Sequence, residues 1–172
     1  LIKVYADLLD IDFMQGHQRR DSLFGIFKRD IEENNEFKFR AKKIYPVKSD
    51  KPAMQTLFDH LTCRTEVIEE DGNKIKKRNI YDPARTKRLH WIRYHIEEQH
   101  KGKMEIFSAE ERIENKNRIR TYLYDVEQKY VIVLEPQRTN HDYYFITAYY
   151  LDEPWAEKGM AKRLRKKLPD LL

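Results

Sequence analysis

The chain has 172 residues, of which 37% are charged and 40% hydrophobic, and its formal net charge is +5. An aromatic content of 12% argues against a disordered chain, and the length predicts one domain with an accessory segment. A basic balance favours polyanionic partners such as nucleic acid. No apolar run reaches the length of a membrane span, and the single cysteine, Cys63, allows no internal disulfide, so we expect a cytoplasmic protein without a membrane partner.

The first fifty residues are predicted to be mainly helical. Apolar residues at helical spacing predict helices over residues 1–14 and 21–35. Residues 37–47 look extended, with Pro46 near their end. We expect residues 1–50 to form an N-terminal helical accessory segment, followed by a main domain over residues 51–172.

The middle of the chain carries clear turn and capping signals. Asp50 and Pro52 open a predicted helix that contains DKPAMQTLFDHLTC. An Asp71-Gly72 pair between two charged, β-leaning runs predicts a hairpin. Asp82, with a proline after it, opens a second predicted helix that ends near Gly102.

The last third changes to the period of strands. KMEIF, RIRTYLYD, QKYVIVLEP and DYYFITAYYL are separated by short connections, which favours an antiparallel meander. The basic run EKGMAKRLRKKL predicts a terminal helix. The predicted class is therefore α+β: N-terminal helices, then a helix packed on a roughly four-stranded antiparallel β-sheet, with a C-terminal basic helix.

Alternation along the strands and the helical period place polar side chains on particular faces. We expect Tyr143, Phe145, Thr147 and Tyr149 to share one face of the last strand. On the predicted helix from Asp82, the side chains beside the apolar stripe are Arg85, Arg88, His95 and Gln99, and His90 lies opposite, in solvent. The resulting cationic, hydroxyl-rich set is Arg88, His95, Arg118, Arg120, Arg138, His141, Thr147 and Tyr149.

These residue types are the ones that a metal-free ribonuclease needs. Such an enzyme uses the 2′-OH of the RNA as nucleophile, a base such as His to accept its proton, and an acid to protonate the leaving 5′ oxygen. Arginine offsets the charge on the phosphate oxygens, and Thr or Tyr hydroxyls bind them. The alternative is that the same residues form ordinary cross-strand pairs on a sheet surface.

Metal and cofactor sites are not expected. The three histidines around HWIRYHIEEQH are five residues apart, and on a helix they diverge too far to bind one zinc ion. The chain has five glycines and no phosphate-binding loop, so we expect no nucleotide cofactor. Glu127 and Lys129, near Asp125, resemble the acidic-x-Lys element of metal-dependent nucleases, an alternative that needs further carboxylates.

Several runs of the sequence resemble a known superfamily. LFDHLTCR, YDPARTKRLHWIRYHIEE, RTYLYD, YVIVLEP, YYFITAYYL and KRLRKKL are similar to phage- and prophage-associated domains of the barnase/EndoU/colicin/RelE-like (BECR) ribonuclease superfamily. The resemblance covers about residues 57–168 and depends mainly on the Arg-x-x-Trp-Ile helix and the Tyr-rich strand. It implies a helix before a four-stranded antiparallel sheet, metal-independent RNA cleavage or a toxin-like role, and functional residues at Arg88, Arg120, Thr147 and Tyr149.

We therefore expect a metal-independent endoribonuclease, toxin-like or phage-associated, that forms a 2′,3′-cyclic phosphate. His95 is assigned as general base or acid, Arg88 and Arg120 as phosphate binders, Thr147 as a hydrogen-bond donor, and Tyr149 as acid or orienting group. The predicted nucleic-acid contacts are Arg118, Arg138, His141, Lys162, Arg163, Arg165 and Lys166.

The expected partners are RNA, with tRNA among the candidates, and an immunity, antitoxin or phage structural protein. Two alternatives stay open on the same fold: a nucleic-acid-binding module without catalysis, and a protein-interaction domain.

Overall fold

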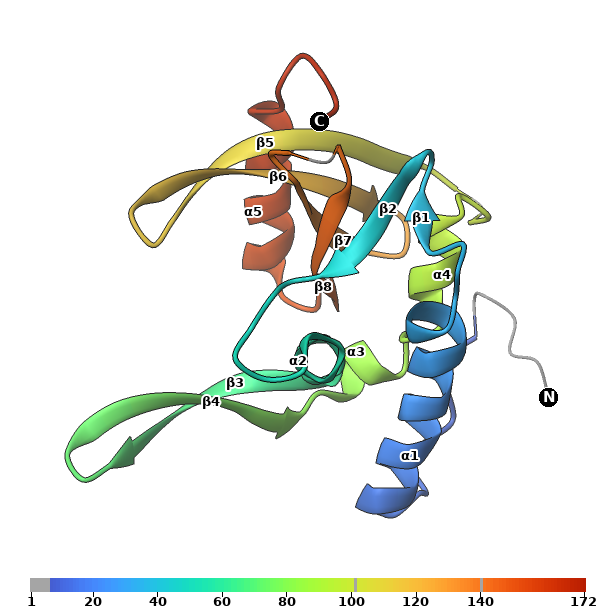
Figure 1. The fold of residues 1–172 in the computed structure, drawn as a ribbon, viewed down its shortest axis with the longest axis vertical. Coiled ribbons are helices and arrows are strands. Elements are labelled where there is room, and N and C mark those ends of the chain that lie inside the picture. Colours follow the sequence, from blue (N-terminus) through green and yellow to red (C-terminus); the bar gives the residue numbers. More distant parts are fainter. Residues whose placement is uncertain (1–6, 101, 140) are drawn as a thin grey trace.

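The computed structural model describes residues 7–100, 102–139 and 141–172 of the chain (Figure 1). Its helical elements are α1 (Gly16–Phe27), the π-helical turn η1 (Lys28–Glu32), α2 (Ala53–Thr62), α3 (Pro83–Thr86), α4 (Trp91–Ile96) and α5 (Pro154–Arg165). Its strands are β1 (Lys38–Phe39), β2 (Lys42–Pro46), β3 (Cys63–Glu70), β4 (Asn73–Tyr81), β5 (Met104–Ile113), β6 (Lys116–Asp125), β7 (Tyr130–Pro136) and β8 (Tyr143–Tyr150). The predicted mixed α+β class is confirmed.

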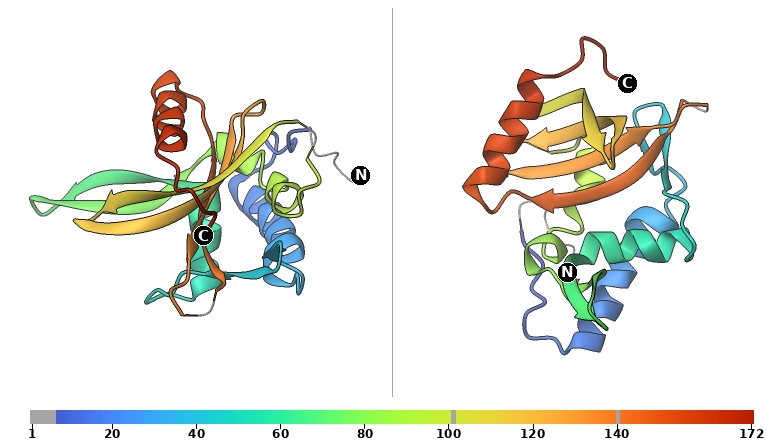
Figure 2. Two further views of the ribbon diagram at one scale, coloured as in Figure 1. Left: turned by 90° about the horizontal axis from the view of Figure 1, so that it is seen from above. Right: turned by 90° about the vertical axis from the view of Figure 1, so that its left-hand side faces the viewer.

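The main sheet has six strands in the order β1-β2-β8-β7-β6-β5. Strands β5 to β8 pair antiparallel in succession, while β2 runs parallel to β8 with Ile44 opposite Tyr143. The sheet therefore differs from the expected one in having β1 and β2 at one edge. Strands β3 and β4 form a separate two-stranded sheet, and this hairpin projects on the same side of the molecule as the β5–β6 hairpin (Figures 1 and 2).

The larger core lies between one face of the sheet and helices α1, α2 and α4. Leu23 and Phe27 of α1, Phe58 of α2, Ile92 of α4 and Leu134 of β7 are each at most 2% exposed. The ring of Phe58 packs edge-on against Phe27, with ring centroids 5.3 Å apart. Burial of these side chains fixes α2 against the sheet, since apolar surface removed from water is the main stabilising term in folding.

Helix α5 covers the opposite face of the sheet, as the right-hand view of Figure 2 shows. Met160 of α5 is fully buried there, against a smaller core that includes Tyr122, Val131 and Val133. The sheet is thus a layer between two cores, which explains why β7 is apolar on both faces.

Two local predictions are confirmed and one is wrong. The Asp71-Gly72 hairpin is present, with φ of 50° and 77° at those residues, the left-handed values that a tight hairpin turn requires. The helix opened near Pro52 is α2. Residues 7–14 contain no helix, and the rest of the predicted helix over residues 1–14 lies outside the described residues.

The helix predicted from Asp82 to about residue 100 is broken into α3 and α4. Between them the backbone makes tight i to i+3 bonds: the amide of Leu89 donates to the Thr86 carbonyl at 3.2 Å, and that of Trp91 to the Arg88 carbonyl at 2.9 Å. These turns change the rotation per residue, so a single 100° helical period no longer sorts the faces. His90, expected in solvent, is therefore buried, with 3% exposed.

Strand β8 contains a β-bulge that reverses which side chains share a face. Val133 pairs with Thr147 but Leu134 pairs with Phe145, so Ile146 is an extra residue. Phe145 lies in the larger core, whereas Thr147 lies opposite Val133, on the α5 face.

The same reversal applies to the tyrosines of β8. Tyr143 packs in the larger core, whereas Tyr149 packs against the α5 core. The expectation that Tyr143, Phe145, Thr147 and Tyr149 share one face is wrong, because simple alternation assumes an unbroken ladder.

The division of the chain after residue 50 stays a prediction. Strands β1 and β2, which precede that boundary, belong to the main sheet, and α1 contributes to the same core as β6, β7 and β8. The two parts therefore share one sheet and one hydrophobic core.

Candidate functional site

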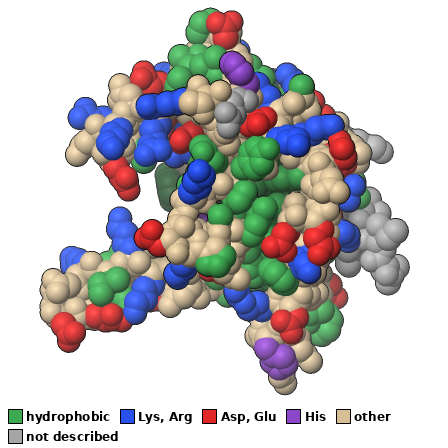
Figure 3. All heavy atoms as spheres, in the orientation of Figure 1, with side chains coloured by type: hydrophobic (Ala, Val, Ile, Leu, Met, Phe, Trp, Pro, Cys, Tyr) green, Lys and Arg blue, Asp and Glu red, His purple; other side chains and the backbone are tan. Residues whose placement is uncertain are grey.

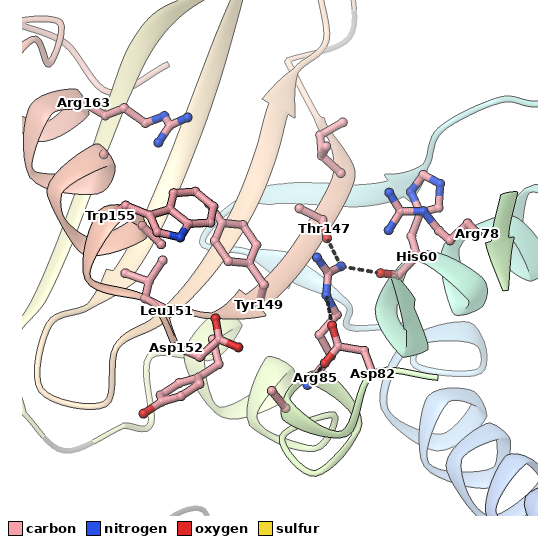
Figure 4. Close-up of a pocket in the computed structure, with 15 residues that line it drawn as sticks. His60, Arg78, Asp82, Arg85, Thr147, Tyr149, Leu151, Asp152, Trp155 and Arg163 are labelled. Carbon is pink, nitrogen blue, oxygen red and sulfur yellow. Dashed lines mark hydrogen bonds and ion pairs between the residues drawn. The ribbon is translucent and has the colours of Figure 1, made fainter. Parts of the chain in front are cut away.

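A pocket of about 590 Å³ opens between the β4–α3 segment, the end of α2, the last half of β8 and helix α5 (Figure 4). In the space-filling view the molecule is hollowed above the projecting β3–β4 hairpin, with Lys and Arg side chains on both sides (Figure 3). The polar residues of its lining are His60, Arg78, Asp82, Arg85, Thr147, Tyr149, Tyr150, Asp152 and Arg163.

Arg85, on α3, is the best-anchored cation of the pocket. Its Nη1 donates to the backbone carbonyl of His60 at 2.8 Å and to Oγ1 of Thr147 at 3.1 Å, and its Nε lies 3.1 Å from Asp82 (Figure 4). Asp82 also caps α3 by accepting a hydrogen bond from the Arg85 amide. These contacts join α2, α3 and β8 and hold the guanidinium in one orientation.

His60 and Arg78 form the wall of the pocket next to the hairpin, and Figure 4 shows the imidazole beside the guanidinium of Arg78. Burial lowers the pKa of His60, and the nearby positive charges of Arg78 and Arg85 lower it further. The nearby Asp59 carboxylate and a hydrogen bond with the backbone of Ile146 act in the opposite direction. The imidazole is therefore neutral near pH 7 and able to accept a proton.

Thr147 and Tyr149 line the centre of the pocket because the β8 bulge turns them toward α5. Burial raises the pKa of Tyr149, and the nearby Glu111 carboxylate raises it as well, while Arg163 and Arg85 act in the opposite direction. The phenol therefore keeps its proton at neutral pH. The two residues supply the pocket with neutral hydroxyl groups.

Helix α5 forms the remaining wall. Trp155 lines the pocket and is 74% exposed, an unusual position for a tryptophan on a helix that covers a sheet. Further along α5, Arg163 lines the pocket and pairs with Glu111 of β5. Asp152, in the β8–α5 connection, adds an acidic group to the lining.

His95, the predicted base, lies in the larger core and does not line the pocket. Its side chain is fully buried: Nε2 lies 2.9 Å from Asp125 Oδ2, and Nδ1 lies 2.7 Å from the Trp91 carbonyl. The sheet separates it from Thr147 and Tyr149, which face α5. In this structure His95 joins α4 to the end of β6.

Neither of the predicted phosphate-binding arginines, Arg88 and Arg120, lines the pocket, and each has structural contacts. The guanidinium carbon of Arg88 lies 3.8 Å from the ring centroid of Tyr150, and its Nη1 donates to the Ala84 carbonyl. Arg120, 8% exposed, lies 2.6 Å from Glu135, and Arg118 lies 3.2 Å from the same carboxylate.

The remaining predicted nucleic-acid contacts fall into two groups. Arg138 and His141 are exposed in the turn before β8, at the end of that strand away from the pocket. Lys162 of α5 and Lys166, the C-cap residue of that helix, line a second groove of about 450 Å³, against β5, and Arg163 lines both cavities. Arg165 is exposed and lines neither.

The acidic-x-Lys element is dispersed. Asp125 points inward to His95, Lys129 pairs with Glu157 of α5 at 2.8 Å, and Glu127 is exposed. Within residues 7–100, 102–139 and 141–172, no three His, Cys, Asp or Glu side chains gather as metal ligands.

Sequence reasoning missed His60, Arg78 and Trp155, and placed Arg85 only beside the helix stripe. His60 follows the buried Leu57 and Phe58 on α2, so its position at the edge of an apolar stripe could have been predicted from the sequence. Trp155 stands seven, eight and eleven residues before Lys162, Arg163 and Lys166 in the sequence, which is one face of a helix. Nothing local signals Arg78, because it depends on where the hairpin packs.

Comparisons of the chain with protein-family models, with curated proteins and with solved structures each give no match. Among the described residues, no helix combines the length and the apolar character that crossing a lipid bilayer requires.

Proposed function

We propose that this pocket is the active site of a metal-independent endoribonuclease. The observation that carries the proposal is the imidazole of His60, kept neutral by burial and by Arg78 and Arg85, in a pocket that also presents the hydroxyls of Thr147 and Tyr149. A neutral base, fixed cations and proton donors around one cavity are what transesterification of RNA requires. The basic net charge of the chain supports a polyanionic substrate.

In the proposed reaction, His60 accepts the proton of the ribose 2′-OH as the 2′ oxygen attacks the adjacent phosphorus. The bond between phosphorus and the 5′ oxygen breaks, and that oxygen takes a proton from the Tyr149 phenol. The products are a 2′,3′-cyclic phosphate and a 5′-hydroxyl end. His60 releases its proton to water, and Tyr149 regains one.

Arg85 and Arg78 stabilise the charge on the non-bridging phosphate oxygens. The described contacts of Arg85 engage Nε and Nη1, which leaves Nη2 for a phosphate oxygen. Thr147 accepts from Arg85 and so orients it, while its own hydroxyl hydrogen is available to the substrate. A guanidinium held in advance loses little entropy on binding, which favours the transition state.

The experiment that tests this proposal is incubation of end-labelled RNA with the purified protein in excess EDTA. We expect fragments that end in 2′,3′-cyclic phosphate, and a rate reduced by about 100-fold or more in His60→Ala, as for loss of a general base. His17→Ala, an exposed histidine on α1, is the matched control and should cleave at the wild-type rate. Full activity of His60→Ala would refute the assignment of His60 as the general base. Cleavage that needs Mg²⁺ would instead favour the metal-dependent alternative based on Glu127 and Lys129.

A binding module without catalysis is the second candidate. The exposed indole of Trp155 beside a basic groove favours it, because aromatic platforms and cations bind nucleic acid without any chemistry. This candidate would be supported by RNA binding that weakens as salt rises, without cleavage in EDTA or in Mg²⁺. An immunity, antitoxin or phage structural protein stays a predicted partner on either proposal.

A further inference from the structure

One face of helix α5 connects the pocket to the groove on β5. At about 100° per residue, Trp155, Gly159, Lys162, Arg163 and Lys166 fall on one stripe of the helix. Trp155, Gly159 and Arg163 line the pocket, and Gly159, Lys162, Arg163 and Lys166 line the groove. Two residues, Gly159 and Arg163, therefore line both cavities, so the two lie next to each other along α5.

Gly159 lies where the two cavities meet. Glycine in a helix interior costs about 1 kcal/mol relative to alanine, so its presence there calls for a reason. A Cβ at this position would come within 3.4 Å of the Arg163 guanidinium. Gly159 thus adds no side chain to the lining that the two cavities share.

The stripe presents charges that are free to bind an anion. Arg163 is paired with Glu111, but within the described part of the chain Lys162 and Lys166 have no ion-pair partner. Arg112 adds a further cation from β5, while Glu110 and Glu111 are the acidic residues of the groove. The groove lining therefore carries more cations than carboxylates.

We propose that this stripe binds a single-stranded RNA segment that extends from the pocket, with one unpaired base stacked on Trp155 and the following phosphates along Lys162 and Lys166. This inference names the substrate of the proposed active site and rests on that function. A base reaches a 74% exposed indole only when it is unpaired, because the faces of paired bases are covered in a duplex.

The length of the stripe sets the length of the segment. From Trp155 to Lys166 the helix rises by about 16 Å, at 1.5 Å per residue. A stacked strand that rises ~3.4 Å per nucleotide places four or five phosphates over that distance. An oligonucleotide of about eight nucleotides is therefore long enough to occupy the pocket and the whole stripe, while a dinucleotide occupies the pocket alone.

Binding of 2′-O-methylated RNA, which lacks the nucleophile and stays intact, tests this inference on the full chain. We expect the oligonucleotide of about eight nucleotides to bind more tightly than a dinucleotide, and more tightly than a duplex of the same sequence. Lys162→Ala/Lys166→Ala should remove the advantage of length and lower the slope of log affinity against log salt by about 1.4, since each single-strand phosphate contact contributes about 0.7. The affinity of this double variant for the dinucleotide should stay unchanged.

Two further variants make the result specific. Lys158→Ala/Lys167→Ala removes the same charge from exposed positions that line neither cavity, and it should keep the advantage of length. Trp155→Ala should weaken binding by about 5- to 150-fold, the effect of losing one stacked base, and Trp155→Phe should weaken it less. RNA should quench the fluorescence of Trp155, since the other tryptophan, Trp91, is 2% exposed.

The outcomes separate this inference from the proposed catalysis. The inference would be overturned if the two double-lysine variants lost affinity for the longer oligonucleotide equally, or if the duplex bound as tightly as the single strand. Either result would count against it even if unmethylated RNA is cleaved. Length-dependent binding lost only in Lys162→Ala/Lys166→Ala, without cleavage of unmethylated RNA, would support the groove and reject the active site.

Discussion

At the scale of single residues, the structure assigns the two histidines opposite roles. His95 is enclosed in the larger core with a carboxylate as partner, whereas His60 stands at the wall of a pocket beside two arginines. A fully enclosed histidine away from any pocket lining cannot reach a substrate, while one with a lowered pKa at a cavity has the properties of a general base. The same residue type thus serves stability at one site and is proposed for chemistry at the other.

The lowered pKa of His60 predicts the pH dependence of cleavage. The rate should rise with pH as His60 loses its proton, with a midpoint below the ordinary histidine value of about 6.5. Arg78→Ala removes a positive neighbour that opposes protonation, so His60 should bind its proton at higher pH and the midpoint should move up. The measurement is kcat/KM against pH for a fluorogenic oligonucleotide.

Lys74→Ala is the matched control for this shift. It removes a positive charge from the exposed far end of the same strand, β4, and should leave the midpoint in place. An unmoved midpoint in Arg78→Ala would mean that His60 is not the titrating group or that Arg78 does not act on it.

At the scale of elements, the bulge in β8 does most to shape the pocket. It directs Phe145 into the larger core and Thr147 toward α5, although the two residues are separated by a single position. Without the bulge, the strand would present both to the same side. The extra residue, Ile146, also lines the pocket, so the irregularity serves both the core and the site.

The bulge predicts unequal effects on stability at these two positions. Phe145→Ala should lower the free energy of unfolding by about 3–5 kcal/mol, because it leaves a cavity at a side chain that is 1% exposed. Thr147→Ala should lower it by about 1 kcal/mol, through the lost hydrogen bond from Arg85. Urea denaturation of the two variants measures both free energies of unfolding. Equal decreases would contradict the placement of Phe145 and Thr147 on opposite faces of the sheet.

At the scale of the whole molecule, the first fifty residues are tied into the fold by backbone pairing and by burial. Strand β2 pairs with β8, the strand that carries Thr147 and Tyr149. Phe27 of α1 and Phe39 of β1 are each 1% exposed within the larger core. The accessory segment predicted from the sequence therefore supports the strand that forms the floor of the site.

Removal of residues 1–50 should prevent stable folding of the remainder. The truncated chain would expose the face of α2 that packs on α1 and leave β8 as an edge strand, which favours aggregation. Near-ultraviolet circular dichroism and binding of a hydrophobic dye measure the loss of fixed packing. A soluble, cooperatively folded remainder would show instead that the segment is detachable.

A shortened hairpin is the control for this truncation. Deleting residues 66–69 and 74–77 removes paired, mostly exposed positions of β3 and β4 and keeps the Asp71-Gly72 turn. This variant should fold, because its larger core is intact.

The sequence by itself determined the features that depend on neighbouring residues. The Asp71-Gly72 turn, the start of α2 near Pro52 and the strands after residue 103 follow from local turn chemistry and from periodicity. The same local signals were enough for the α+β class. Thr147, Tyr149 and Arg163 were also named from the sequence, and the structure places all three in the pocket lining.

Only the tertiary structure decided which polar side chains meet. Arg85 reaches His60 and Thr147 across 25 and 62 positions of the chain, and no local pattern records such a contact. The break between α3 and α4 changes the helical rotation by a fraction of a turn, which is enough to bury His90. The bulge in β8 shifts the strand alternation by one residue, which is enough to place Phe145 and Thr147 on opposite faces of the sheet. The pocket exists because α2, the hairpin and α5 pack around β8, and packing of distant elements depends on the whole buried surface rather than on any single segment.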